Sequence, residues 1–311
     1  VEAIDRAAED SRIEALVLNL DEMGSGGVTK LNRVAEPVAR FRESGKRIVA
    51  SGGGYSQAQY LLASTADEIY LHPLGDVFFQ GFGYYRLFFG EAVDSLLIDW
   101  HVFRAGEYKT LHDSATRSQM SEVEKQEARI FIDQLWQGYR ERIAAARSTT
   151  PDAIQQFADG YLDRLRSADG NMALLAKQES LVDELLTFDE VEQRLAELVG
   201  EDTETGSYRQ IDFRDYLHAT RPAAGRSTEG EGDVGVIVAS GMIVDGEQPP
   251  GTVGSDSMIE LIRQARDDDD IRAVVLRVDS GGGSQFASDL ILSELKLLRD
   301  AGKPLIVSMG D

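Results

Sequence analysis

Residues 10–21 read DSRIEALVLNLD and residues 268–279 read DDDIRAVVLRVD, so the two stretches agree at six of twelve positions. Each is followed by a glycine-rich stretch, a helical segment and a second strand pattern: EMGSGG and SGKRIVAS in the first copy, SGGGS and AGKPLIVS in the second. The spacing also matches, because 32 residues separate Ile13 from Gly45 and 31 separate Ile271 from Gly302. The chain therefore contains a duplicated unit.

Each copy predicts a strand, a helix and a second strand. The runs ALVLNL and AVVLRV are short and apolar, as expected of parallel strands covered on both faces. In the second copy, four apolar residues recur at helical spacing: Leu290, Ile291, Leu295 and Leu298. The first copy continues with a predicted helix, YSQAQYLLAS, and a predicted strand, DEIYLHP. This order predicts an α/β fold with tandem duplicated βαβ domains and right-handed crossovers.

A helical region separates the two copies. Ser121 and Glu124 match the S-x-x-E capping box, and apolar residues behind them predict one long helix to about Arg147. Pro151 is expected to open the next helix. Four parts are predicted: a first α/β repeat (1–147), a helical connecting region (148–220), a Gly/Ser/Pro-rich linker (221–233) and the start of a second repeat (234–311).

Composition excludes several classes of function. The 311 residues carry 32 Lys and Arg against 54 Asp and Glu, a net charge of −22, which disfavours binding to nucleic acid phosphates. The absence of cysteine excludes disulfides, thiolate metal sites and a cysteine nucleophile. No apolar run reaches the roughly 18 residues needed to span a bilayer. Both ends read as interrupted elements, so we expect the chain to be a soluble fragment.

The glycines after the second-copy strand are a candidate anion site. In VDSGGGSQ (278–285), a strand runs into three glycines before a helix, which places bare backbone amides at a positive helix end. That arrangement suits a phosphate or a developing oxyanion, although the P-loop and dinucleotide-binding signatures are missing. A tight turn that needs glycine for its geometry is the alternative. Gly24, Gly26 and Gly27 in the first copy favour that alternative at their own site.

Lys109, in FRAGEYKTLHDSA (103–115), is a candidate catalytic base. A catalytic lysine must be neutral at working pH, so its pKa has to fall from about 10.4 through burial or nearby positive charge. Phe103 and Tyr108 could supply apolar walls, and Arg104 could supply charge. An ordinary solvated lysine is the alternative, and the local sequence leaves both open.

Other polar residues predict no site. The four histidines (His72, His101, His112 and His218) lack metal-ligand spacing, so structural or exposed roles are expected. The run DDDD (267–270) lacks the spaced pattern of a calcium loop and is interpreted as solvated. Ser56 lies at a predicted strand-to-helix turn, where it could be a nucleophile or a helix cap.

These elements together resemble the signal peptide peptidase A family (peptidase family S49) in its long, duplicated form, a family of bacterial Ser/Lys-dyad serine proteases. The resemblance covers essentially the whole chain. It is carried, in order, by YSQAQYLLAS, FRAGEYKT, IDQLWQGYRERIAAAR, LVDELL, MIVDGEQPPGTVGSDSM, VLRVDSGGGS and GKPLIVSMG. The resemblance implies a ClpP- and crotonase-like fold that occurs twice.

The resemblance also implies roles for particular residues. The family motif G-x-Y-K corresponds to Gly106, Tyr108 and Lys109, with the lysine as general base. The family's nucleophile motif S-M-G-x-x-A-S-G-G begins at Ser308, so its serine is expected beyond Asp311 and the chain alone is expected to be inactive. The oxyanion site of the family maps onto Gly282 and Gly283. Two departures stand out: Gly281 replaces the usual proline, and Thr110 replaces the usual serine.

The family's biology completes this set of expectations. The resemblance implies cleaved signal peptides or other short apolar peptides as substrates, and no metal or other cofactor. It implies homo-oligomers such as a tetramer, and a membrane anchor, absent from these residues, that holds the catalytic domains on the outer, periplasmic face of the bacterial cytoplasmic membrane. Two alternatives remain open: a non-catalytic scaffold or peptide-binding relative of the same fold, and a crotonase-type acyl-CoA enzyme.

Overall fold

The computed structural model describes residues 1–24, 26–103, 113–221 and 233–310. The chain divides into two compact units, Val1–Thr220 (unit 1) and Arg221–Asp311 (unit 2). Each unit is described by itself below. Lys109 and most of the predicted linker lie outside the described residues. Among the described helices, none is both long enough and apolar enough to cross a bilayer.

Unit 1 is built around a four-stranded parallel sheet in the order β1-β2-β4-β6. The four strands of this sheet are β1 (Ala15–Asn19), β2 (Arg47–Gly52), β4 (Glu68–Leu71) and β6 (Glu184–Leu185). A separate parallel pair consists of β3 (Tyr55–Ser56) and β5 (Val77–Phe78). The helices are α1 (Glu2–Glu9), α2 (Val28–Glu43), α3 (Gln57–Ala63), α4 (Gly90–Ser95), α5 (Asp113–Thr116), α6 (Glu122–Ala146), α7 (Pro151–Asp159), α8 (Tyr161–Ser167), α9 (Met172–Gln178), α10 (Phe188–Val199) and α11 (Phe213–Thr220).

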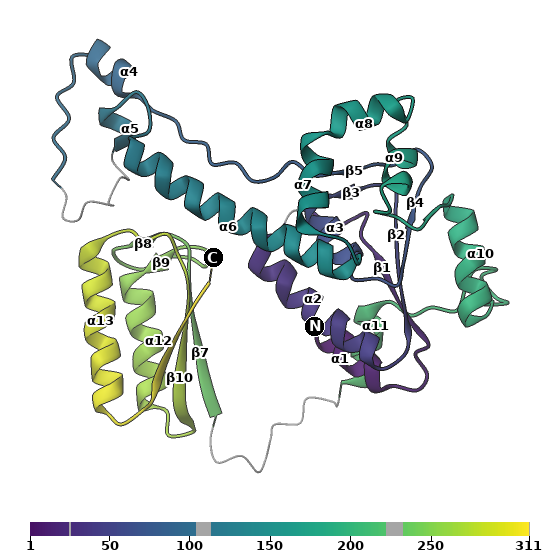
Figure 1. The fold of residues 1–311 in the computed structure, drawn as a ribbon. Coiled ribbons are helices and arrows are strands. Elements are labelled where there is room, and N and C mark those ends of the chain that lie inside the picture. The colour runs from purple at the N-terminus through teal and green to yellow at the C-terminus, as the bar shows by residue number, and fades with distance from the viewer. Residues whose placement is uncertain (25, 104–112, 222–232, 311) are drawn as a thin grey trace. The chain divides into compact units, whose positions relative to one another are not determined.

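Both faces of the unit 1 sheet are covered. Helices α2 and α3 pack on one face, where Val38, Phe41 and Tyr60 are fully buried in the main core (Figure 1). Helix α10 lies on the other face and buries Val191 and Leu195, in one cluster with strand residues of the sheet. An i, i+4 pair of apolar residues on α10 thus forms the stripe that a sheet-packing helix needs.

The predicted long helix is confirmed. Helix α6 begins after Ser121, whose hydroxyl accepts from the Glu124 N–H while the Glu124 side chain accepts from the Ser121 N–H. This reciprocal capping box satisfies two backbone donors that the first helical turn leaves unpaired. Helix α7 opens at Pro151, as predicted, with Thr150 as its cap.

Residues 148–220, which the sequence analysis set apart as a connecting region, belong to unit 1. Strand β6 pairs with β4 and extends the first sheet, and the buried Tyr60 hydroxyl donates to the Leu181 carbonyl at 2.6 Å. A two-residue strand carries too little periodicity to be predicted, so the sequence showed the helices here but not the pairing that joins them to the sheet.

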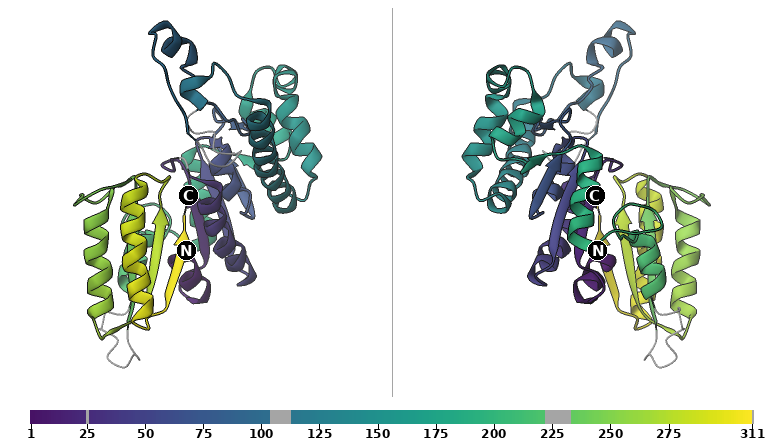
Figure 2. Two further views of the ribbon diagram at one scale, coloured as in Figure 1. Left: turned by 90° about the vertical axis from the view of Figure 1, so that its left-hand side faces the viewer. Right: turned by 90° about the vertical axis from the view of Figure 1, so that its right-hand side faces the viewer.

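Unit 2 contains a three-stranded parallel sheet in the order β11-β10-β7. Its elements are β7 (Asp233–Ser240), β8 (Ile243–Val244), β9 (Val253–Gly254), α12 (Ser255–Asp267), β10 (Ile271–Asp279), α13 (Gln285–Asp300) and β11 (Leu305–Met309). Helices α12 and α13 lie side by side on one face of this sheet (Figure 2). Ile262, Val274 and Leu298 are fully buried between the helices and the strands.

The duplication is visible in matching hydrogen bonds. In unit 1, Lys46 Nζ donates to the carbonyls of Ala7 and Asp10, both at 2.7 Å, at the end of α1. In unit 2, the corresponding Lys303 Nζ donates to the carbonyls of Ala265, at 2.7 Å, and Asp268, at the end of α12. Each lysine thus binds the negative end of a helix, the one that precedes β1 in unit 1 and the one that precedes β10 in unit 2. The predicted α/β class with duplicated parallel βαβ units is confirmed.

Candidate functional site

The candidate base Lys109 belongs to residues 104–112, outside the described part of the chain. The segment that leads to it is held to α6. Arg86 forms an ion pair with the buried Glu124 carboxylate, and Phe82 packs edge-on against Trp136 at 6.5 Å between ring centroids. Glu124 is the third residue of α6, and its side chain also completes the capping box with Ser121, so one carboxylate both stabilises the helix start and binds Arg86.

The glycine loop of unit 2 connects β10 to α13. Gly282 has a φ of +109°, a backbone conformation that side-chain-bearing residues rarely adopt. A Cβ atom at Gly283 would lie 2.0 Å from the Ile243 carbonyl oxygen. That close approach arises because the Ile243 backbone forms hydrogen bonds on both sides of Gly283. The Ile243 N–H donates to the Gly282 carbonyl, and the Ile243 carbonyl accepts from the Ser284 N–H. Glycine is therefore required at both positions on steric grounds.

The two predicted oxyanion donors differ. The Gly282 N–H donates to the Ser280 hydroxyl at 3.1 Å, whereas the Gly283 N–H donates to no acceptor among the described residues. Gly283 also lies just before the first turn of α13, where the helix dipole favours negative charge. The loop thus presents one free amide to an anion, and a second amide becomes free if the Ser280 hydroxyl rotates away.

Several polar residues that sequence reasoning missed hold this loop in place. Ser284 caps α13 by accepting from the Ala287 N–H at 3.2 Å, and its hydroxyl donates to Asp245 Oδ1 at 3.0 Å. Ser255 and Ser257, at the start of α12, accept from the backbone N–H groups of residues 246 and 248, so they hold the segment that follows Asp245 and not the glycine loop itself. The G-S-D-S run at 254–257 was the available signal, because closely spaced serines at a helix start often bind neighbouring backbone.

Ser56 is a helix cap in this structure. Its hydroxyl accepts from the Gln59 N–H at 3.4 Å, and the Gln59 side chain accepts from the Ser56 N–H at 2.8 Å. Gln59 also donates to the Leu20 carbonyl at 2.6 Å, which ties α3 to the loop after β1. The capping alternative therefore accounts for Ser56 without a catalytic role.

The glycines of the first copy form a turn with fewer steric constraints than the turn of the second copy. Gly27 is the N-cap of α2 and has no positive φ, and a Cβ atom at Gly26 would contact only the Leu31 side chain, at 3.3 Å. The two glycine-rich loops therefore occupy equivalent places in the repeats, but only the second needs glycine for close backbone contact.

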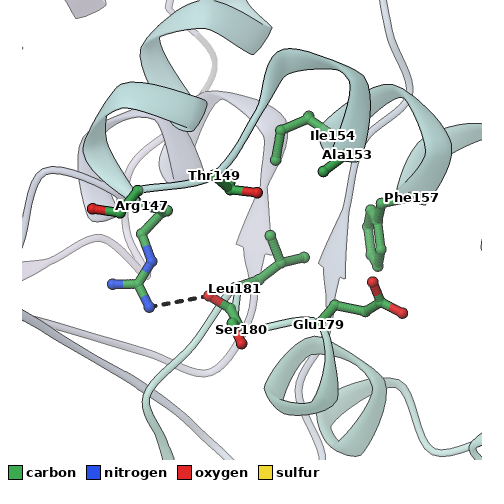
Figure 3. A pocket seen from close by; sticks show the side chains of 9 residues that line it. Arg147, Thr149, Ala153, Ile154, Phe157, Glu179, Ser180 and Leu181 are labelled. Atoms are coloured by element: carbon green, nitrogen blue, oxygen red, sulfur yellow. Dashed lines mark hydrogen bonds between the residues drawn. The ribbon is translucent and has the colours of Figure 1, made fainter.

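A pocket of about 350 Å³ lies where the ends of α6 and α9 meet α7 (Figure 3). Arg147 borders it and donates to Asp183 at 2.7 and 3.2 Å and to the Ser180 carbonyl at 3.1 Å. Burial opposes the charge of Arg147, but the hydrogen bonds and attraction to Asp183 hold its pKa above the ordinary value. The Arg147 charge at the border of the pocket is therefore already paired with the Asp183 carboxylate.

No metal centre emerges from the described residues, in which no three His, Asp or Glu side chains gather as ligands would. Asp268 of the DDDD run is the C-cap of α12, and its carboxylate accepts from the Asp270 N–H at 2.9 Å in the turn that follows the helix. Asp268, Asp269 and Asp270 are all exposed, in line with the solvated run expected from the sequence.

The family model of Peptidase family S49 matches residues 40–202, just over half of the chain. The chain belongs to peptidase family S49. The matched range runs from the end of α2 through β6 and α10, and it includes the segment with Lys109. The glycine loop of unit 2 lies outside it, so the assignment of Gly282 and Gly283 rests on other evidence.

Similarity to individual S49 proteins extends over the whole chain. "Protease 4" of Salmonella typhi is 38% identical over 310 residues, which cover 100% of this chain and 49% of that protein. "Protease 4" of Haemophilus influenzae is 35% identical over 308 residues, 99% of this chain and 50% of that protein. "Serine protease SPPA, chloroplastic" of Arabidopsis thaliana is 27% identical over 98% of this chain and 44% of that protein. The chain spans about half the length of these relatives.

Proposed function

We propose that this S49 chain is part of a serine endopeptidase with a Ser/Lys dyad. The observation that carries the proposal is the 38% identity to a protein named "Protease 4", which extends over both the Lys109 segment and the glycine loop. The free N–H of Gly283 at the start of α13 supports it, because acyl transfer needs an amide donor at the developing oxyanion.

The proposed roles divide between the two repeats. Lys109 of the first repeat, neutral at working pH, takes the proton of a serine hydroxyl as that oxygen attacks the peptide carbonyl carbon. The backbone N–H of Gly283, joined by that of Gly282, stabilises the resulting oxyanion. The lysine then returns the proton to the leaving amine, and an acyl-enzyme ester forms. Water, deprotonated by the same lysine, hydrolyses the ester and releases the serine.

In this proposal, the nucleophile is not one of the serines in these 311 residues. Ser308-Met309-Gly310 match the start of the family's nucleophile motif, which places the serine after Asp311 in a polypeptide that carries the whole motif. Ser56 is excluded because its hydroxyl caps α3. The 311-residue chain alone is therefore expected to be inactive.

Substrate and location follow from the family resemblance. We propose cleaved signal peptides and similar short apolar peptides as substrates, on the outer face of the bacterial cytoplasmic membrane. Homo-oligomers, tetramers by resemblance, would be the active form. The net charge of −22 gives no attraction to anionic lipid headgroups, so binding at a membrane would need a separate anchor.

A fluorogenic peptide assay tests the proposal. The 311-residue chain should give no turnover, whereas a polypeptide that contains it together with the complete serine motif should hydrolyse the peptide. Turnover by the 311-residue chain that disappears in Ser56→Ala would contradict the assignment of the nucleophile. Inactivity of the longer polypeptide would favour a non-catalytic scaffold, and saturable coenzyme A binding in place of hydrolysis would favour an acyl-CoA enzyme.

A further inference from the structure

Arg277 lies near the C-terminal end of β10, beside the residues with which the family's nucleophile motif begins. In the parallel pairing of β10 with β11, Arg277 is in register with Ser308, and Val278 is in register with Met309. Side chains in register across neighbouring parallel strands point to the same face of the sheet. The guanidinium of Arg277 therefore reaches the S-M-G residues from the neighbouring strand.

Two hydrogen bonds and one close approach join Arg277 to this part of the motif. Its Nη1 donates to the Ser308 hydroxyl at 3.1 Å and to the Met309 carbonyl at 3.3 Å. A Cβ atom at Gly310 would lie 3.0 Å from Arg277 Cζ and would overlap Nη2. Arg277 thus explains a hydroxyl at the first position of S-M-G and the lack of a side chain at the third.

The charge of Arg277 is directed at these residues. Among the residues that the structure describes, no carboxylate forms an ion pair with Arg277, and its two acceptors are the neutral oxygens of Ser308 and Met309. A guanidinium is charged at any working pH, and hydrogen bonds from a charged donor are stronger than those between neutral groups. The arginine therefore holds the motif and not an acidic partner elsewhere.

Unit 1 lacks this arrangement at the matching place. The repeat alignment equates Asn19 with Arg277, and Asn19 is in register with Ser51. The Asn19 side chain accepts instead from the Asp21 N–H at 3.2 Å, and the Asp21 carboxylate accepts from the Gly53 N–H at 2.7 Å. The copy that begins the nucleophile motif thus carries the arginine, and the other copy holds its strand ends with an amide and a carboxylate.

We propose that Arg277 is a positioning residue for the nucleophilic serine, an inference that rests on the proposed function. In S-M-G-x-x-A-S-G-G only x-x-A separates the motif glycine from the nucleophile. Arg277 also lies on β10, the strand that runs into the glycine loop through Asp279 and Ser280. One side chain thereby ties the strand end before the oxyanion amides to the strand end before the serine. A displacement of about 1 Å at reacting groups can cost about 100-fold in rate.

Kinetics of the polypeptide that carries the complete serine motif test this role. Arg277→Ala should lower kcat for a fluorogenic peptide by about 10-fold to 100-fold, with KM changed by less than about 2-fold, because the misplaced group is the nucleophile. Arg277→Lys should retain part of the lost kcat, because an ammonium keeps the charge but not the planar fork of donors. Arg272→Ala removes an exposed arginine of the same strand and should leave both constants unchanged.

Chemical rescue separates positioning from a general loss of structure. Millimolar methylguanidinium should raise kcat of the Arg277→Ala variant and should not change kcat of Arg272→Ala. Unchanged kcat in a folded Arg277→Ala variant would overturn the inference, as would a loss that neither lysine nor methylguanidinium reduces. Inactivity of the unaltered polypeptide would contradict the proposed function and this inference together, whereas an active polypeptide that is insensitive to Arg277→Ala would overturn this inference alone.

A second measurement tests the contact without peptidase activity. The 311-residue chain has no cysteine, so the Ser308→Cys variant carries a single thiol at the position that accepts from Arg277. A neighbouring guanidinium favours the thiolate, so the thiol pKa should fall below its ordinary value of about 8.5. The pH dependence of iodoacetamide labelling measures that pKa, which should return toward about 8.5 when Arg277→Ala is added. The same labelling profile with and without Arg277 would contradict the contact and overturn the inference.

Discussion

The two repeats share the same strand–helix–strand arrangement but carry different glycine loops. Both use a lysine to bind the end of a helix, and the C-caps Asp10 and Asp268 have nearly the same backbone angles, with ψ of 111° and 113°. The glycine loops differ in their steric demands. Among the described residues, helix α10 covers the second face of the unit 1 sheet. The lysine contacts are therefore shared by the two repeats, whereas the glycine loops that follow β1 and β10 differ.

The helix pairs of the two repeats show the same contrast. In unit 2, Glu294 of α13 is buried and forms ion pairs with Arg263 and Arg266 of α12. In unit 1, α1 and α2 are linked instead by the exposed Asp5–Arg40 pair at 2.6 Å. The repeat alignment equates Glu294 with Pro37, so the duplicated frame tolerates a buried carboxylate or a proline at one position.

The glycine loops give the largest expected difference. Gly283→Ala should destabilise unit 2 by about 3 kcal/mol, because the new methyl group overlaps the Ile243 carbonyl and forces the backbone apart. The matched change in the first copy, Gly26→Ala, should cost less than about 1 kcal/mol, because only the flexible Leu31 side chain has to move. Hydrogen exchange of β10 and α13 amides, compared with β1 and α2 amides, measures both. Equal costs would show that the two loops are not sterically distinct.

The helix-binding lysines should behave alike. Lys46→Met and Lys303→Met each remove two charge-assisted hydrogen bonds to carbonyls, so each should destabilise its own unit by about 2 kcal/mol. Both tryptophans, Trp100 and Trp136, lie in unit 1, so tryptophan fluorescence during urea unfolding follows that unit. Hydrogen exchange follows unit 2. A large loss of stability in one unit with none in the other would contradict the proposed equivalence of the two lysines.

Alkaline pH should destabilise unit 1 and not unit 2. This effect should be the smallest of the three predicted changes in stability. All ten tyrosines lie in unit 1, and burial, followed by its hydrogen bond to Glu68, raises the pKa of Tyr70 from 10.0 to about 12. A raised pKa means that the folded state favours the neutral phenol. The stabilisation is therefore complete below pH 10 and is lost as pH rises toward 12.

Urea titrations between about pH 9 and about pH 11.5, followed by tryptophan fluorescence, should show unit 1 losing stability, and Tyr70→Phe should make that loss less steep. Hydrogen exchange of unit 2, corrected for the intrinsic rate at each pH, should show no tyrosine-dependent change. An unaltered pH slope in Tyr70→Phe would mean that the Tyr70 phenol does not contribute to the alkaline loss.

The sequence predicted features that depend on local pattern. The capping box at Ser121, the helix start at Pro151 and the duplicated strand–helix–strand order all follow from spacing within one short window. It did not predict β6 and β8, because two-residue strands have no usable periodicity. Nor could spacing show which sheet face α10 would cover.

The candidate site was predicted only in part for a related reason. Three glycines after a strand indicated free amides, but the hydroxyl of Ser280 binds one of them and the Ile243 backbone fixes the other's position. Both partners act through tertiary or loop geometry that residue spacing does not encode. The role of Lys109 remains a prediction from the family motif, since its position lies outside the described residues.

The central claim is that Lys109 is the general base of a peptidase, and a matched pair of lysine variants tests it most directly. In the polypeptide that carries the complete serine motif, Lys109→Met should lower kcat/KM for a fluorogenic peptide at least about 100-fold, as expected for loss of a general base. Lys125→Met, which removes an exposed lysine paired with Glu122 on α6, should leave kcat/KM within about 2-fold, because exposed pairs contribute little. Unchanged hydrolysis in a folded Lys109→Met variant would contradict the account.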